Sequence, residues 1–253
     1  IQMGFEAAGK APKAAIDGTI NDLIENKKSP VFPYRGLEDS KLTECTKDNP
    51  KAWTDAMAAI PVLKQSGLTS DHLRAVIRNE LHFYDPRDIQ DDDNAKAGEK
   101  STGTLGYAQI TPKGITEFVR VVPEFKDFIK DKGYEVPDDE NKILEDPGCV
   151  PMIVAAKMAS LIKNYQMHNQ KHPDNPVAIN PRSLIYGYNA DVQRVNQNGK
   201  ITFESMTDRE ADFKRALKYD LQKVHPSSDP RILDASNHLR HVLQQLNAIQ
   251  KSR

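Results

Sequence analysis

The feature that most constrains the fold is a helical apolar pattern in residues 73–86, LRAVIRNELHFYDP. Its apolar side chains recur at every third or fourth position, which is typical of one buried helix face. They are Leu73, Val76, Ile77, Leu81 and Tyr84. Thr69 or Ser70 can cap the start, and Asp85-Pro86 stops the helix. The pattern therefore predicts a helix with one face in the core.

Glu80 is the residue of this helix that needs an explanation. It lies three residues after Ile77 and four after Val76, so it emerges on or beside the apolar face. A carboxylate there is costly to bury unless it is hydrogen-bonded, neutralised or used in chemistry. One interpretation is a structural glutamate paired with Arg74 or Arg78. The other is an acid that donates a proton.

A second segment, residues 103–112, has the composition of a tight turn that leads into a helix. Gly103-Thr104-Leu105-Gly106 permits the turn, and Tyr107-Ala108-Gln109-Ile110 alternates ring, small, amide and aliphatic side chains. Thr111-Pro112 then begins a new helix, with proline at a first-turn position.

Together with Tyr188-Asn189-Ala190-Asp191, these segments resemble the lytic transglycosylases of the goose-type lysozyme superfamily. The family has an apolar helix ending in Glu-Ser-x-Phe-x-Pro, then Gly-Ala-x-Gly-Leu-Met-Gln-Leu-x-Pro, and later Tyr-Asn-Ala-Gly. Three motifs in the right order are a fairly specific signal, and they cover about residues 68–195. The chain departs from the pattern at Leu81 (serine in the family), at Asp191 (glycine) and in the acidic insert 87–100.

The resemblance implies a mainly α fold of the α+β lysozyme-like kind. We expect an N-terminal helical lobe at 1–66, a transglycosylase core at 67–198 and a C-terminal helical extension at 199–253. The implied activity is cleavage of the β-1,4 bond between N-acetylmuramic acid and N-acetylglucosamine in peptidoglycan. Glu80 would serve as acid and then base, giving 1,6-anhydro products without any cofactor.

The resemblance also assigns roles around Glu80. Tyr188 would hydrogen-bond the glutamate and orient it, and Gln109 would line the cleft. The backbone near Tyr107 and Ala108 would hold acetamido groups. The full expected substrate-binding set is Ser101, Tyr107, Ala108, Gln109, Tyr188 and Asn189. Without the other two motifs, Tyr188 and Asn189 would be interpreted as a core ring and a helix-end cap.

Two alternatives remain open for the function. Lysozyme-type hydrolysis by an inverting route would use a second carboxylate roughly 6.5–9.5 Å away to activate water, and Asp85, Asp88 and Asp91 are the candidates. A drifted domain could instead bind peptidoglycan without cleaving it. The expected location is the bacterial periplasm or cell envelope, or secretion to it. A secreted antibacterial effector or phage lysin would have an inhibitor or immunity protein as partner.

The charge balance and the hydropathy of the chain argue against some classes of protein. With 35 basic and 36 acidic residues the net charge is -1, which argues against nucleic-acid binding, and no apolar run has the length of a membrane span. Cys45 and Cys149 form a disulfide or stay two buried thiols. The pairs His168/His172 and His238/His241 lack further ligands, so we predict no metal. Trp53 fits the core better than a sugar-stacking site.

Overall fold

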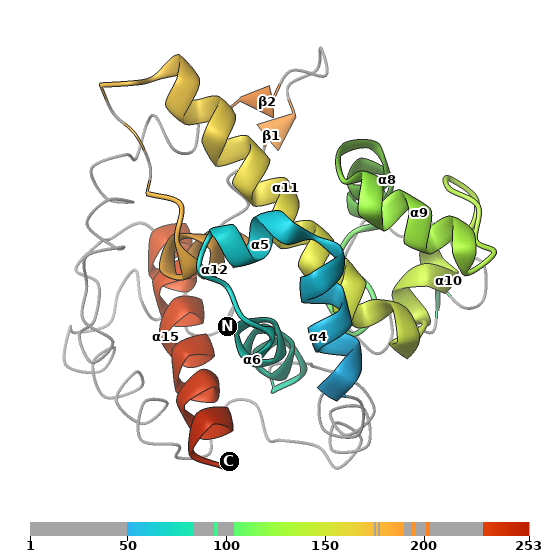
Figure 1. Cartoon of the computed structure of the whole chain (residues 1–253), viewed down its shortest axis with the longest axis horizontal. Helices are drawn as coiled ribbons and strands as arrows, with labels where there is room; N and C mark the ends of the chain where they lie inside the picture. The colour runs from blue at the N-terminus through green and yellow to red at the C-terminus, as the bar shows by residue number, and fades with distance from the viewer. Residues whose placement is uncertain are drawn as a thin grey trace. The chain divides into compact units, whose positions relative to one another are not determined.

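The computed structural model describes part of the chain, and that part is mainly helical, as expected (Figure 1). The described residues are 50–82, 94–95, 104–174, 176, 178–189, 194–195, 201–202 and 230–252. The chain divides into two compact units. We call residues 32–160 and 245–253 the Glu80 unit, and residues 1–31 and 161–244 the Tyr188 unit. The expected division at residues 66 and 198 stays a prediction.

The Glu80 unit begins with three helices: α4 (Pro50–Ala59), α5 (Pro61–Gln65) and α6 (Ser70–His82). Apolar side chains at helical spacing predict one helix over about residues 50–65, and the structure shows two helices there. Pro61 has no N–H to continue the ladder and its ring excludes the preceding residue from helical geometry, so α5 starts anew there. α4 packs against α6. Trp53 of α4 is wholly buried, so its interpretation as a core residue is confirmed.

Helices α8 (Pro112–Val121), α9 (Pro123–Asp131) and α10 (Glu140–Glu145) follow in the same unit, and α8 packs against both α9 and α10 (Figure 1). Thr111 caps α8 by accepting a hydrogen bond from the Gly114 N–H at 3.1 Å. Phe118 of α8 meets Phe125 of α9 edge-on, with ring centroids 6.1 Å apart. A 3-10 turn, η2 (Pro147–Cys149), then leads into the next long helix.

That helix is α11 (Val150–Lys171), and the boundary between the two units falls within it. The apolar spacing predicts a helix over about residues 151–167, and α11 runs one turn further. α12 (Pro181–Asn189) and the antiparallel pair β1 (Arg194–Val195) and β2 (Ile201–Thr202) belong to the Tyr188 unit. The last helix, α15 (Pro230–Lys251), confirms the helix expected from Pro230 onward. No helix among the described residues combines the length and apolarity that crossing a bilayer requires.

Candidate functional site

Glu80 lies in the last turn of α6, at the border of its buried face. Val76, Ile77 and Leu81 are wholly buried, while the Glu80 side chain is half-buried. This confirms the helix over Ser70–His82 and the position of Glu80 beside the apolar stripe, while Tyr84 and the expected stop at Asp85-Pro86 lie outside the described residues. Arg74, one of the two candidate structural partners, forms an ion pair with Asp71, with Nη1 and Oδ1 3.5 Å apart.

Residues 104–110 fold into a compact turn, which we call the 104–110 turn. Leu105 and Ile110 pair as an antiparallel bridge: the Leu105 N–H donates to the Ile110 carbonyl at 2.9 Å, and the reverse bond measures 3.3 Å. Both side chains are buried, so they anchor the turn in the core. Between them the backbone is left-handed at Gly106 (φ 66°) and at Gln109 (φ 50°).

Gly106 is required because the turn passes very close to α10. A Cβ at this position would collide with the Leu144 carbonyl oxygen and lie 2.8 Å from its carbonyl carbon. Real side chains do not reach such distances from rigid backbone, so only glycine fits. The 104–110 turn is therefore held against the end of α10 as well as by its own bridge.

The Gln109 side chain folds back onto the turn that carries it. Its Nε2 donates to the Gly106 carbonyl at 2.9 Å, and its Oε1 accepts from the Thr104 hydroxyl at 2.9 Å. The structure thus brings Tyr107, Ala108 and Gln109 together on one short turn. Ala108 is buried, whereas Tyr107 and Gln109 are half-buried.

Asp146 organises the segment that follows α10. Its carboxylate accepts hydrogen bonds from the Gly148 N–H (2.8 Å), the Tyr134 hydroxyl (3.1 Å) and the Cys149 thiol (3.2 Å), and Lys132 Nζ lies 3.7 Å away. Burial opposes the charge, but these donors outweigh it and hold the pKa of Asp146 below its usual value. Burial and Asp146 together raise the pKa of Cys149 to about 12.

Cys149 is consequently a free, buried and protonated thiol that helps to fix the start of α11. Its candidate disulfide partner, Cys45, lies outside the described residues. So do Ser101 and the candidate second carboxylates Asp85, Asp88 and Asp91.

In the Tyr188 unit, α12 starts with a reciprocal cap. The Ser183 N–H donates to Asn180 Oδ1 at 3.0 Å, and the Asn180 N–H donates to Ser183 Oγ at 3.1 Å. Two backbone N–H groups at the helix start, which have no partner within the helix, are thereby hydrogen-bonded. The sequence expectation placed the first helical residue at Ser183, and the helix in fact begins at Pro181 because the cap lies at Asn180.

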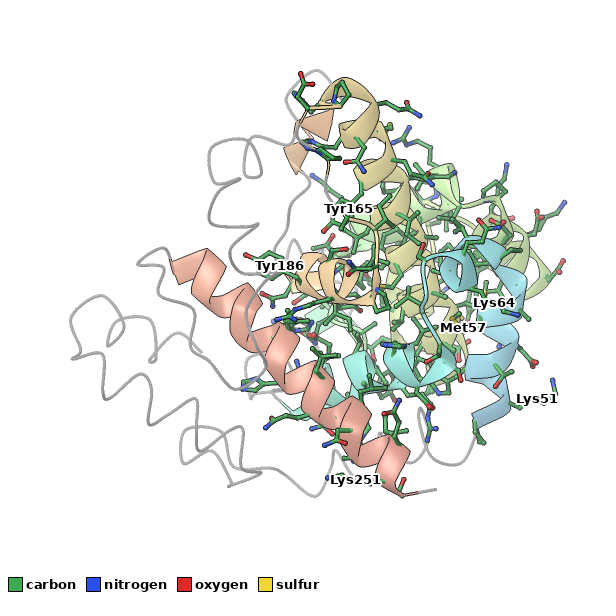
Figure 2. All side chains as sticks on the ribbon, turned by 60° about the vertical axis from the view of Figure 1, so that its left-hand side comes forward. Lys51, Met57, Lys64, Tyr165, Tyr186 and Lys251 are labelled. Atoms are coloured by element: carbon green, nitrogen blue, oxygen red, sulfur yellow. The ribbon has the colours of Figure 1, made fainter. Side chains whose placement is uncertain are left out.

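The Tyr165 hydroxyl links α11 to α12. Tyr165 of α11 is wholly buried and donates its hydroxyl to the Ser183 carbonyl at 3.1 Å. Gly187 lets the ring approach, since a Cβ there would collide with Tyr165 Oη. Burial, and to a smaller degree the neighbouring Tyr186, raises the pKa of Tyr165. Figure 2 shows Tyr165 on α11 and Tyr186 on α12.

Tyr188 and Asn189 are the last two residues of α12. Tyr188 is buried, and its ring stacks parallel to His238 of α15, with centroids 6.0 Å apart. Asn189 is half-buried at the helix end. Both residues belong to the Tyr188 unit, whereas Glu80 and the 104–110 turn belong to the other unit.

The histidine pairs do not build a metal centre within the described part of the chain. His168 lies in the last turn of α11 and His172 directly follows the helix end, with ring centroids 4.7 Å apart, but His168 is buried and His172 exposed. Over the residues that the structure describes, no group of three or more His, Cys, Asp or Glu side chains could hold a metal ion.

The sequence did not predict three interactions that hold these segments in place. They are the hydrogen bonds to the Asp146 carboxylate, the hydrogen bond between Thr104 and Gln109, and the close contact of Tyr165 with Gly187. Gly187 was the one readable signal, since a glycine inside a helix is unfavourable unless another group needs the space. Comparison with protein-family models, curated proteins and solved structures finds no match to this chain.

Proposed function

We propose that the chain is a lysozyme-like enzyme that cleaves the β-1,4 bond between N-acetylmuramic acid and N-acetylglucosamine in peptidoglycan. The observation that carries the proposal is the half-buried Glu80 carboxylate bordering the wholly buried Val76, Ile77 and Leu81 on α6. An apolar border disfavours the charged form of a carboxyl group, and the neutral acid can donate a proton.

In the proposed reaction Glu80 acts twice. As the neutral acid it protonates the glycosidic oxygen, and the bond to the anomeric carbon breaks with oxocarbenium-like character. As the carboxylate it then removes the proton of the sugar's 6-hydroxyl, whose oxygen forms the new bond to the anomeric carbon. The products are a 1,6-anhydro end and a free 4-hydroxyl, and Glu80 returns to its protonated form. One carboxyl group and no cofactor suffice.

Two further features support this proposal. The 104–110 turn is held rigidly at its ends, so it can present backbone groups to acetamido substituents. α12 is fastened by Tyr165 and by its cap, so it holds Tyr188 in a fixed orientation. The family resemblance also assigns Tyr188, Asn189 and Ser101 to the glycan-binding set, and these assignments stay predictions. A peptidoglycan substrate places the enzyme in the bacterial envelope or in secretions directed at it.

The test is digestion of purified peptidoglycan sacculi by the wild type and by Glu80→Gln. Loss of a general acid costs about 10²- to 10⁴-fold in rate, so Glu80→Gln should release almost no soluble fragments. Glu124→Gln is the matched control, because Glu124 is also half-buried in the same unit but lies at the start of α9. Both variants should melt within a few degrees of the wild type.

Mass spectrometry of the fragments decides the chemistry. Fragments lighter by one water, with anhydro ends, support transglycosylation. Fragments with reducing ends would instead show hydrolysis of the muramidase type. The activities of Asp85→Asn, Asp88→Asn and Asp91→Asn would then identify the second carboxylate. Co-sedimentation of the wild type with sacculi without any released fragment would replace the proposed cleavage by a peptidoglycan-binding role. Full activity of Glu80→Gln would end the assignment of Glu80 as the acid.

A further inference from the structure

We infer that Gln109 is a positioning residue, which holds the 104–110 turn in the shape that presents the half-buried Tyr107 to the glycan and does not itself bind the glycan. The inference rests on the proposed function. It differs from the role that the sequence pattern gave to Gln109, which was to line the cleft.

The backbone of Gln109 is the first observation. Its φ of 50° lies in the left-handed region, which a side chain with a Cβ adopts only when the surrounding structure compensates the strain. It is the only non-glycine residue with positive φ among the residues that the structure describes. The turn therefore depends on something that holds Gln109 in this conformation.

The carboxamide of Gln109 supplies that restraint. Nε2 donates to the Gly106 carbonyl and Oε1 accepts from the Thr104 hydroxyl, each at 2.9 Å, so both polar ends are engaged inside the turn. The backbone N–H of Gln109 donates to the same Gly106 carbonyl at 3.3 Å. A side chain used in this way acts on the glycan only through the geometry of its neighbours.

The rest of the turn has no freedom to absorb a change at Gln109. Leu105 and Ile110 are buried and bridged to each other, and Gly106 presses against the Leu144 carbonyl. Ile110 is followed directly by Thr111, which caps α8. Relaxation of Gln109 would therefore displace Tyr107 and Ala108, the two residues between the fixed glycine and Gln109.

The experiment compares Gln109→Ala, Gln109→Gly, Thr104→Val and the Gln109→Ala/Thr104→Val double variant. Glycine adopts φ 50° without strain, whereas alanine keeps the strain and loses both bonds. Thr116→Val is the matched control, because its hydroxyl donates to Glu140 at 2.9 Å on the exposed side of α8. kcat and KM are measured on soluble glycan strands, and the melting temperature is recorded in parallel.

Small misplacements of binding groups lower kcat/KM roughly ten- to a hundredfold, so we expect a loss of this order for Gln109→Ala. Thr104→Val should lower kcat/KM in the same direction, and the double variant should be no worse than Gln109→Ala. Gln109→Gly should recover part of the loss, although it also lacks the amide. Thr116→Val should match the wild type.

Two results would overturn the inference: equal losses in Gln109→Gly and Gln109→Ala, or a Thr104→Val variant with wild-type kinetics. Either would mean that the amide contacts the glycan directly. A wild type that releases no fragments contradicts the proposed function instead. The same variants are then ranked by co-sedimentation with sacculi, where stronger retention of Gln109→Gly than of Gln109→Ala supports the inference and equal retention refutes it.

Discussion

Replacing Gly187 by alanine tests how α12, and with it Tyr188, is held in place. The new Cβ would collide with Tyr165 Oη and lie 3.2 Å from Tyr165 Cζ. Tyr165 is wholly buried and donates to the Ser183 carbonyl, so neither the ring nor the hydroxyl can move away freely. Either α12 shifts, or the hydrogen bond breaks.

The expected change in the free energy of unfolding follows from two opposing effects. Forcing an extra methyl into a packed site typically costs about 1–3 kcal/mol, and losing the Tyr165–Ser183 hydrogen bond costs about 1 kcal/mol. Alanine in a helix interior gains about 0.5–1 kcal/mol over glycine. We therefore expect Gly187→Ala to lower the free energy of unfolding by about 1–3 kcal/mol, although alanine is the better helix former.

The assay is urea denaturation of the wild type, Gly187→Ala, Tyr165→Phe and the double variant. Tyr165→Phe removes the colliding oxygen and should cost about 1 kcal/mol by itself. In that background Gly187→Ala should be nearly neutral, which gives a coupling of about 1–3 kcal/mol between the two sites. Additive losses, or a Gly187→Ala variant more stable than the wild type, would refute the close approach of Tyr165 to α12.

Three further changes probe the Glu80 unit. Trp53→Ala should lower the free energy of unfolding by about 3–5 kcal/mol, because the ring is wholly buried. Addition of glycan strands to the wild type should leave the fluorescence of Trp53 unchanged, and a glycan-dependent shift would contradict the buried position. Thr111→Ala should cost about 1 kcal/mol in urea denaturation by removing the cap of α8, and Thr111→Ser should restore it. Because burial raises the pKa of Cys149 from 9.0 to about 12, the unfolded thiol ionises first, so stability is full below pH 9 and falls as the pH rises toward 12. Cys149→Ser should flatten this alkaline loss, and an unchanged pH profile would show that other groups cause it.

Helices with several turns of apolar periodicity were predictable from the sequence. α6, α11 and α15 each bury one or more faces over at least three turns, so the period is visible without tertiary information. α10 was missed because its six residues, ENKILE, contain less than two full turns. Its helical form depends on burial of Ile143 and Leu144, which a local pattern does not reveal.

The candidate site likewise has features that the sequence could predict and features that it could not. The sequence could single out Glu80 because an acidic residue beside an apolar stripe is visible in the spacing alone. It could not predict the left-handed backbone of Gln109 or the direction of its amide, since both depend on Thr104 and on the contact of Gly106 with Leu144. The spacing also gave no sign that Tyr188 would stack on His238, which lies on a helix distant in sequence.

The two glycines that matter most share one physical role. Gly106 admits the Leu144 carbonyl and Gly187 admits the Tyr165 hydroxyl, at distances that any side chain would prevent. Each glycine directly precedes a residue of the proposed site, Tyr107 in the first case and Tyr188 in the second. Because packed segments transmit small displacements, a methyl group at either glycine would shift the neighbouring aromatic ring. The placement of each ring is therefore set, within its own unit, by a close approach that only glycine permits.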